Sequence, residues 1–234
     1  MTHSSVTVFC DESGNGNSGH LVVAAVALED TDISAAQRTL HEEFERTMAL
    51  AERSGIAQSS GDPARGFHMS DDKWGVQSSV IEPLAQSLRR KVFVFATDRT
   101  TVKSNREPDH LLELYRKLGL TVVRRYSNYA SVRFVIETND DLVPHMADLV
   151  TKWSAATRHG QVMAEQQPKA PGSLLAYADY FALPCASWLD HGMAPREKDA
   201  RFMQFVKLLP SISLILSLEK GRLHSRTHPW TPVS

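Results

Sequence analysis

Three acidic residues lie where the surrounding hydrophobic pattern predicts an apolar side chain. Asp11 ends the β-branched and aromatic segment VTVFC, and Glu137 ends the apolar segment VRFVIE. Asp179 lies in SLLAYADYFA, where its spacing from Leu175 and Ala182 puts it on the apolar face of a helix. A buried carboxylate is costly unless it has a partner, a proton or a metal ion. These positions therefore indicate a site rather than ordinary surface charge.

Together the three carboxylates form the ligand set of a divalent-metal site. Magnesium and manganese prefer carboxylate and water oxygens. Two such ions about 3.5–4 Å apart hold a phosphodiester, one activating water and the other stabilising the leaving oxygen. We therefore expect Asp11, Glu137 and Asp179 to bind one or two Mg²⁺ or Mn²⁺ ions and to be catalytic. Taken singly, each also fits a structural role: Asp11 in a turn, Glu137 at a hydrated strand end, Asp179 in a buried ion pair.

Four motifs resemble those of a known bacterial family in their order along the chain. They are FCDESGNGN, FHMSDD, VRFVIETND and LLAYADYFA, spread over residues 5–185. The family has an N-terminal Asp-Glu-Ser-Gly signature, is catalogued as domain of unknown function 3800, and looks like a member of the ribonuclease H-like, retroviral-integrase-like superfamily. The resemblance implies a three-layer fold, with a mixed central sheet that begins with a hairpin and helices on both faces.

The same resemblance implies a function and a set of site residues. Asp11, Glu137 and Asp179 match the acidic metal ligands of the ribonuclease H-like arrangement. The family more often carries Asp where this chain has Glu137, and Glu reaches farther. The resemblance also implies a role in defence against phage or in mobile-element biology.

The FHMSDD motif adds polar residues that the family tends to carry beside its metal site. His68 is our candidate for moving a proton or contacting phosphate, although a histidine in such a segment also fits a purely hydrogen-bonded role. Asp71 and Asp72 are predicted to cap the helix that follows. Glu12 follows Asp11 on a strand, so it should point to the opposite face of the sheet and be structural.

Basic and aromatic residues suggest contacts with a nucleic acid substrate. Arg124, Arg125 and Tyr126 combine charge with a ring that can stack on a base, as in proteins that bind single strands. The tail is similar, with Arg222, His224, Arg226, His228 and Trp230, and it also fits a disordered terminus. Arg89, Arg90 and Lys91 more simply complement a helix dipole.

Composition excludes several classes of protein. The chain has 234 residues, is 42% hydrophobic and 23% charged, and carries a net charge of -1, as expected of a globular protein. The longest apolar run has eight residues, whereas a membrane helix needs about 20. Two cysteines match no disulfide or metal framework, and no secretory signal is visible. We therefore expect a cytoplasmic protein with no membrane partner.

Charge is unevenly distributed along the chain. Residues 1–62 hold 3 basic and 10 acidic side chains, whereas residues 196–234 hold 7 basic and 3 acidic ones. A basic end can follow phosphates while an acidic end binds cations, although uneven charge is also common on inert surfaces.

One motif is best rejected. Gly14, Gly16 and Gly19 fit the G-x-G-x-x-G pattern of dinucleotide-binding loops, but that loop must open a helix. Here it opens HLVVAAVAL, a β-branched run, and Asp11 and Glu12 would repel a pyrophosphate. The glycines instead predict the turn of a hairpin.

Hydrophobic periodicity predicts a mixed α/β fold in one layered unit. A hairpin is followed by alternating helices and strands, with no internal repeat and no long linker. We expect one domain over residues 1–234, with a core at about 5–190 and a C-terminal extension at about 191–234. Helices are predicted over residues 33–53, 77–90, 109–118, 142–156, 173–189 and 200–208, and strands over 6–9, 21–28, 91–96, 132–137 and 161–164, with an apolar segment at 212–218.

Three functional hypotheses follow. The first is a metal-dependent nuclease that hydrolyses the phosphodiester bonds of RNA or DNA through the carboxylate-bound ions. The second is a non-catalytic module that binds nucleic acid or protein on the same fold, which the near-neutral charge also fits. The third is a phosphoesterase that acts on small nucleotides.

Overall fold

An antiparallel hairpin opens the chain, as predicted. The computed structural model describes residues 4–14, 19–53, 66–87, 91–99, 107–157 and 160–231. Strand β1 (Ser5–Ser13) pairs with β2 (His20–Glu29). Gly14 follows β1 with a φ of 102°, which a glycine adopts without strain. The run after the glycines is therefore a strand and not the helix that a dinucleotide-binding loop requires.

Seven strands form one mixed sheet in the order β5-β4-β1-β2-β3-β6-β7. β4 lies parallel to β1 and to β5, and β3 lies parallel to β6, whereas β2 runs antiparallel to both neighbours and β7 antiparallel to β6. The predicted mixed α/β sheet is thus confirmed. The five further strands are β3 (Val92–Asp98), β4 (Ser131–Glu137), β5 (Gln161–Gln167), β6 (Ile212–Ser217) and β7 (Gly221–Ser225).

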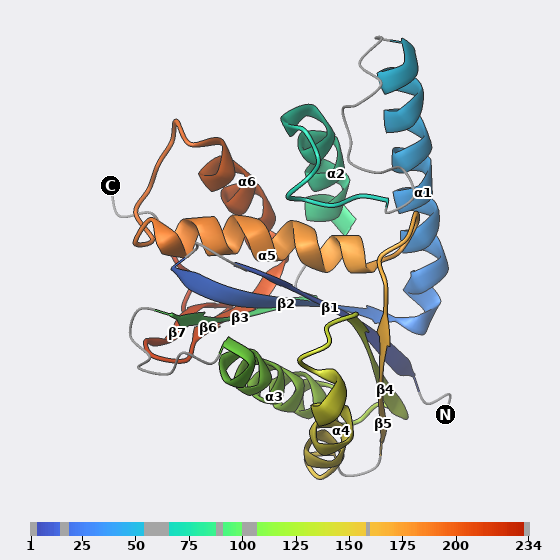
Figure 1. The fold of residues 1–234 in the computed structure, drawn as a ribbon, viewed down its shortest axis with the longest axis vertical. Helices are drawn as coiled ribbons and strands as arrows, with labels where there is room; N and C mark the ends of the chain where they lie inside the picture. Colours follow the sequence, from blue (N-terminus) through green and yellow to red (C-terminus); the bar gives the residue numbers. More distant parts are fainter. Residues whose placement is uncertain are drawn as a thin grey trace.

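Helices cover both faces of this sheet (Figure 1). Along β2, Val22 and Ala24 face one hydrophobic core, while Leu21 and Val23 face the other, which explains why the strand is apolar throughout. The first core is covered by α1 (Asp30–Arg53), α2 (Trp74–Ser87), α5 (Leu175–Asp190) and α6 (Ala200–Leu208), and the second by α3 (Glu107–Arg125) and α4 (Met146–Ser154).

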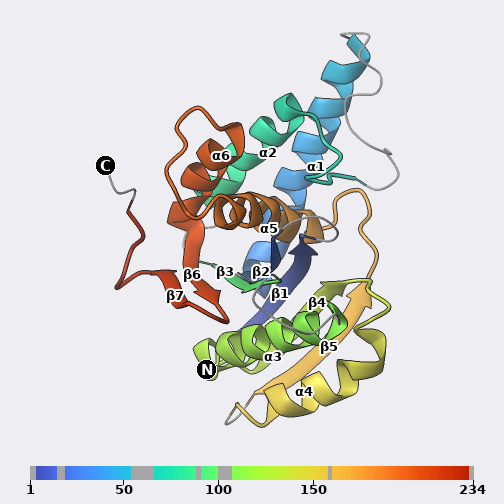
Figure 2. The ribbon, with the colours of Figure 1, turned by 60° about the vertical axis from the view of Figure 1, so that its left-hand side comes forward.

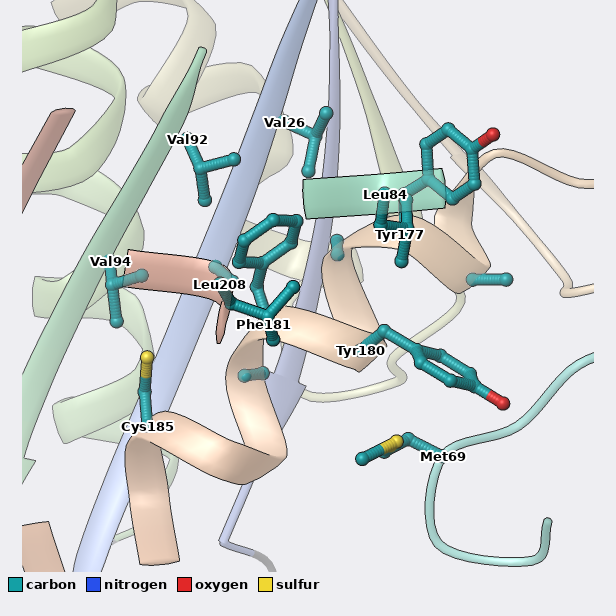
Figure 3. Packing of buried hydrophobic residues seen from close by; sticks show 14 of the residues in the cluster. Val26, Met69, Leu84, Val92, Val94, Tyr177, Tyr180, Phe181, Cys185 and Leu208 are labelled. Carbon is teal, nitrogen blue, oxygen red and sulfur yellow. The ribbon is translucent and has the colours of Figure 1, made fainter. Parts of the chain in front are cut away.

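Helix α5 lies directly on the sheet, between the strands and helices α2 and α6 (Figure 2). It is buried on nearly all sides, as its apolar sequence requires. Figure 3 shows Phe181 pointing from α5 toward the strands that carry Val26 and Val92. Tyr177 and Phe181 fall on other faces of the helix than Asp179, where the sequence most simply predicts core residues, and both are buried in the first core. This burial holds the backbone around Asp179 in a fixed position.

Several element boundaries differ from the predictions. Helix α1 begins at Asp30, directly after β2, so Asp32 and Ser34, the two residues that the sequence offers as caps for a helix starting near residue 33, lie inside the helix. Helix α3 continues to Arg125, because Val122 and Val123 pack into the second core. The tail forms β7 where no strand was predicted, and β6 pairs with β3, so residues after 190 extend the sheet.

Some sequence predictions lie outside the described residues. They are the loop predicted from the Gly-, Ser-, Asp- and Pro-rich composition of residues 54–66, of which only Gly66 is described, the second glycine of the G-x-G-x-x-G pattern (Gly16), and Arg89 and Arg90 before β3. Cys10 and Cys185 are both described, buried and free, and they lie in different cores. Within the described ranges, no helix is long and apolar enough to span a membrane.

Helices α3 and α4 approach closely at Gly119, where a larger residue should destabilise the fold. A methyl group on Gly119 would lie 2.1 Å from a ring carbon of Trp153, which is fully buried against Phe134. Overpacking costs about 1–3 kcal/mol, more than the gain of up to about 1 kcal/mol in helix propensity. We expect Gly119→Ala to lower the free energy of unfolding by about 1–2 kcal/mol in urea titrations.

Gly75 in α2 provides the matched control for this prediction. A methyl group there would meet no atom within 4 Å. Gly75→Ala should therefore leave stability unchanged or raise it by up to about 1 kcal/mol. Equal effects of the two substitutions would contradict the packing argument.

Candidate metal centre

The three predicted carboxylates come together above one end of β1 and β4. Asp11 lies within β1 rather than at its end, because the strand continues to Ser13 and Asp11 pairs with Ala24. Glu137 is the last residue of β4, which runs parallel to β1. Asp179 reaches the same place from the second turn of α5. Two neighbouring strands and the helix that crosses them thus position the cluster.

At the centre of the cluster lies the ammonium group of Lys169. Its Nζ is 2.6 Å from Asp11 Oδ2, 3.1 Å from Asp179 Oδ2 and 3.2 Å from Glu137 Oε2. The Lys169 side chain is only 4% exposed. Lys169 follows β5, the strand next to β4, so the loop after β5 brings it to the ends of β1 and β4. No pattern in the sequence singles out Lys169.

The charges of the cluster do not balance. Three carboxylates face one ammonium, and the Asp11 and Asp179 side chains are 1% and 5% exposed. Burial and repulsion from Asp179 raise the pKa of Asp11 well above its ordinary value. Burial also acts to raise the pKa of Glu137, but a hydrogen bond with Asp11 and the Lys169 ammonium together lower it. The surrounding carboxylates likewise outweigh burial and raise the pKa of Lys169.

His68 joins the cluster on the side of Asp179. Its Nδ1 is 3.3 Å from Asp179 Oδ2, and its Nε2 is 3.4 Å from Lys169 Nζ. The Ser70 hydroxyl lies 2.9 Å from Nδ1, and an Nδ1–H that donates to Ser70 Oγ leaves Nε2 free to accept from the ammonium. The backbone N–H of Met69 donates to the same Asp179 oxygen at 2.8 Å. The segment predicted to lie beside the candidate site therefore lies beside the carboxylates.

Asp72 takes a different role from the predicted helix cap. Its Oδ2 accepts hydrogen bonds from the Tyr180 hydroxyl at 2.5 Å and from the His68 backbone N–H at 3.0 Å. Asp72 thus ties the loop that carries His68 to helix α5, next to Asp179. Its other oxygen is buried without a hydrogen-bond partner among the described residues. Burial raises the pKa of Asp72 to about 6.

This raised pKa makes a testable prediction about pH and stability. A carboxyl group whose pKa is higher in the folded state favours folding below that pKa and loses this contribution as the pH rises. Between about pH 4 and pH 6, Asp72 should therefore lower the free energy of unfolding by about 1–3 kcal/mol. Asp72→Asn should remove this part of the pH dependence in urea titrations at pH 4–7. An unchanged pH profile in the variant would contradict the assignment.

Glu12 points to the opposite face of the sheet, as predicted. Its carboxylate accepts hydrogen bonds from the Tyr115 hydroxyl at 2.9 Å and from the Asn139 amide at 2.6 Å. Burial raises the pKa of Glu12, although both hydrogen bonds act against this. Glu12 thus links β1 to α3 and to the loop after β4.

The structure does not bring the predicted substrate-binding residues to this cluster. Arg124 and Arg125 end α3, and Tyr126 follows them just before the start of β4, whereas Glu137 is the last residue of β4. Seven residues of strand span about 20 Å. Tyr126 packs edge-on against Phe93. Any contact of these three residues with substrate would be remote from the carboxylates.

The donor set fits a divalent cation, provided that Lys169 moves aside. As the side chains stand, no three His, Cys, Asp or Glu residues in the described part of the chain are arranged to hold an ion. The Lys169 ammonium lies within 3.2 Å of all three carboxylates and occupies the position where an ion would bind. The donors are all oxygens, as Mg²⁺ and Mn²⁺ prefer. Asp11 Oδ2 is buried 2.6 Å from the Lys169 ammonium, so an ion that took the ammonium's place would gain this oxygen as a ligand.

The protein is thus an α/β protein with a mixed seven-stranded sheet, in which three carboxylates surround one buried lysine. Comparison with protein-family models gives no match, and no curated protein matches the chain. The function must therefore be argued from the site itself.

Proposed function

We propose that this protein is a divalent-metal-dependent nuclease with a ribonuclease H-like fold. One observation carries the proposal: three carboxylates from β1, β4 and α5 converge on a single cationic position, where Lys169 now lies. Three carboxylates surround one ammonium, and a divalent ion would offset more of their charge than the single positive charge of Lys169 does. The mixed sheet that begins with a hairpin and has helices on both faces supports the proposed fold.

Each residue of the cluster then has a role. Asp11, Glu137 and Asp179 would hold Mg²⁺ or Mn²⁺, and the bound metal would supply an activated water and charge stabilisation at the phosphate. Lys169, once displaced from the carboxylates, remains close enough to neutralise a phosphate oxygen. His68 lies beside Asp179, its Nδ1 is hydrogen-bonded to the Ser70 hydroxyl, and it can transfer a proton at Nε2. By the resemblance to the Asp-Glu-Ser-Gly family, we infer a role in phage defence or mobile-element biology.

A cleavage experiment tests this proposal directly. The purified chain is incubated with labelled single- and double-stranded RNA and DNA, and with an RNA–DNA hybrid, in Mn²⁺, Mg²⁺ or EDTA. Asp179→Asn is the test variant, and Asp148→Asn, an exposed carboxylate paired with Lys152, is the control. We expect cleavage that needs metal, disappears in Asp179→Asn and persists in Asp148→Asn. Cleavage in EDTA would overturn the proposal, and hydrolysis of small nucleotides alone would favour a phosphoesterase.

The position of Lys169 favours a second candidate, a non-catalytic nucleic-acid- or protein-binding module. In that case Lys169 would be a permanent internal cation that replaces the metal and stabilises the carboxylates. The two candidates differ in metal binding. Mn²⁺ binding can be followed by electron paramagnetic resonance. If the protein is a nuclease, the wild type should bind Mn²⁺ and Asp179→Asn should not. If it is a non-catalytic module, neither should bind Mn²⁺.

A further inference from the structure

A second site lies away from the carboxylate cluster, at the start of β6. Here a cavity of about 600 Å³ opens between the end of α3, the start of β3 and β6, and strand β7 with the segment that follows it. Three strand spacings separate β1 from β6 in the sheet, so the cavity lies at least about 14 Å across the sheet from Asp11. Figure 2 shows β6 and β7 on the left and β4 and β5 on the right.

Three arginines give this cavity a strong positive charge. Arg125, Arg222 and Arg226 all line it, and none of the described lining residues is acidic. None of the three guanidinium groups forms an ion pair or a hydrogen bond with another described residue. An arginine is always charged in a protein and presents five donors that match phosphate oxygens. Residues far apart in the sequence thus converge around one hollow as cations that form no ion pair within the described part of the chain.

The floor of the cavity is apolar and aromatic. Phe93, Leu209 and Leu214 contribute to it, and so does Trp230, which is half-buried and packs against Trp188. Such a surface suits the flat body of a nucleobase, because aromatic rings stack on bases.

His224 holds this aromatic wall in place. Its Nδ1 accepts a hydrogen bond from the Trp230 backbone N–H at 3.1 Å, and its Nε2 donates to the Ile212 carbonyl at 3.3 Å. Burial lowers the pKa of His224, consistent with a neutral ring that fixes Trp230 rather than adding charge. The positive charge of the cavity therefore comes from the arginines.

We propose that this cavity binds a nucleoside di- or triphosphate, with the phosphates on Arg125, Arg222 and Arg226 and the base on the aromatic wall. Three cations suit a chain of two or three phosphates better than a single phosphate. A volume of about 600 Å³ is within the usual range for small-ligand sites. The site is independent of the proposed nuclease, since it shares no residue with the carboxylate cluster.

Isothermal titration calorimetry on the full chain tests the proposal. ATP, AMP, adenosine, inorganic phosphate and a 12-nucleotide single strand are titrated in EDTA, so that metal at the carboxylates makes no contribution. We expect ATP to bind about 10-fold more tightly than AMP, and Arg222→Gln or Arg226→Gln to weaken ATP binding about 10-fold each. Arg133→Gln, which removes an exposed arginine paired with Glu165, should leave binding unchanged.

Several outcomes would overturn the proposal. One is no ATP binding by the wild-type chain, and another is equal binding of ATP and adenosine. If Arg133→Gln weakened ATP binding as much as Arg222→Gln does, the effect would come from the overall charge of the protein and not from this cavity. Tighter binding of the 12-nucleotide strand than of ATP would instead make this surface a path for nucleic acid. The cleavage experiment can fail without affecting any of these results.

Discussion

Asp11→Asn is expected to abolish metal-dependent cleavage and, without metal, to make the protein more stable. The substitution keeps the shape of the side chain but removes one ligand charge, and the charge stabilisation that a metal supplies is worth several kcal/mol. We therefore expect the cleavage rate to fall by about 10³-fold or more. In EDTA the same change relieves repulsion among the three carboxylates, because Asp11 lies beside Glu137 and Asp179. The free energy of unfolding at pH 7 should rise by about 1 kcal/mol or more.

The opposite signs of these two effects make the prediction specific. A residue that merely holds the fold would lose activity and stability together. Urea titrations in EDTA and cleavage rates in Mn²⁺ measure the two quantities separately, with Asp148→Asn as the control for an Asp-to-Asn change at an exposed site. Loss of cleavage together with a large loss of stability would show that Asp11 is structural. Full activity in the variant would show that Asp11 is not a required ligand of the proposed metal site.

Much of the carboxylate cluster could be predicted because local pattern and burial agree there. Asp179 interrupts an apolar helix, so its burial follows from periodicity, and Glu137 ends a strand parallel to β1. His68 was found through its motif. Lys169 could not be found in this way, because it lies in a loop between Gln167 and Pro171 with no periodic pattern. Three buried carboxylates call for a cation, but the sequence offers 26 lysines and arginines, and only the tertiary fold selects one.

The same distinction explains which elements of the fold were missed. The central strands β1 to β4 are apolar and were predicted within a few residues. Strand β7 has the sequence GRLHS at the edge of the sheet, and its only strand partner in the described part of the chain is β6. Polar residues are expected at an edge, so no local signal separates this strand from a disordered tail. The cavity lined by Arg125, Arg222 and Arg226 depends on β7, so it could not be predicted from the sequence, although its residues are recognisable there as basic and aromatic.

The largest stability effect is expected from Lys169→Met in the absence of metal. The substitution removes the cation that lies within 3.2 Å of three carboxylates while keeping an unbranched side chain of similar length. Removing one partner from a buried ionic cluster costs about 3–5 kcal/mol. We expect urea titrations in EDTA to show a loss of this size. Lys152→Met, which breaks the exposed ion pair with Asp148, should leave the free energy of unfolding nearly unchanged, because exposed ion pairs contribute little.

Metal should reverse this loss if the proposed function is correct. A divalent ion would replace the missing ammonium, and it would no longer compete with Lys169, so Mn²⁺ should bind the variant more tightly than the wild type. At 100 times the dissociation constant, a ligand stabilises the folded state by about 2.7 kcal/mol. Recovery of about this size in Mn²⁺ would mark the cluster as a metal site that Lys169 fills in its absence. A loss of stability that Mn²⁺ does not reverse would indicate that Lys169 is the permanent cation of a non-catalytic module. If Lys169→Met caused no loss of stability, the carboxylates would be neutralised by protonation instead.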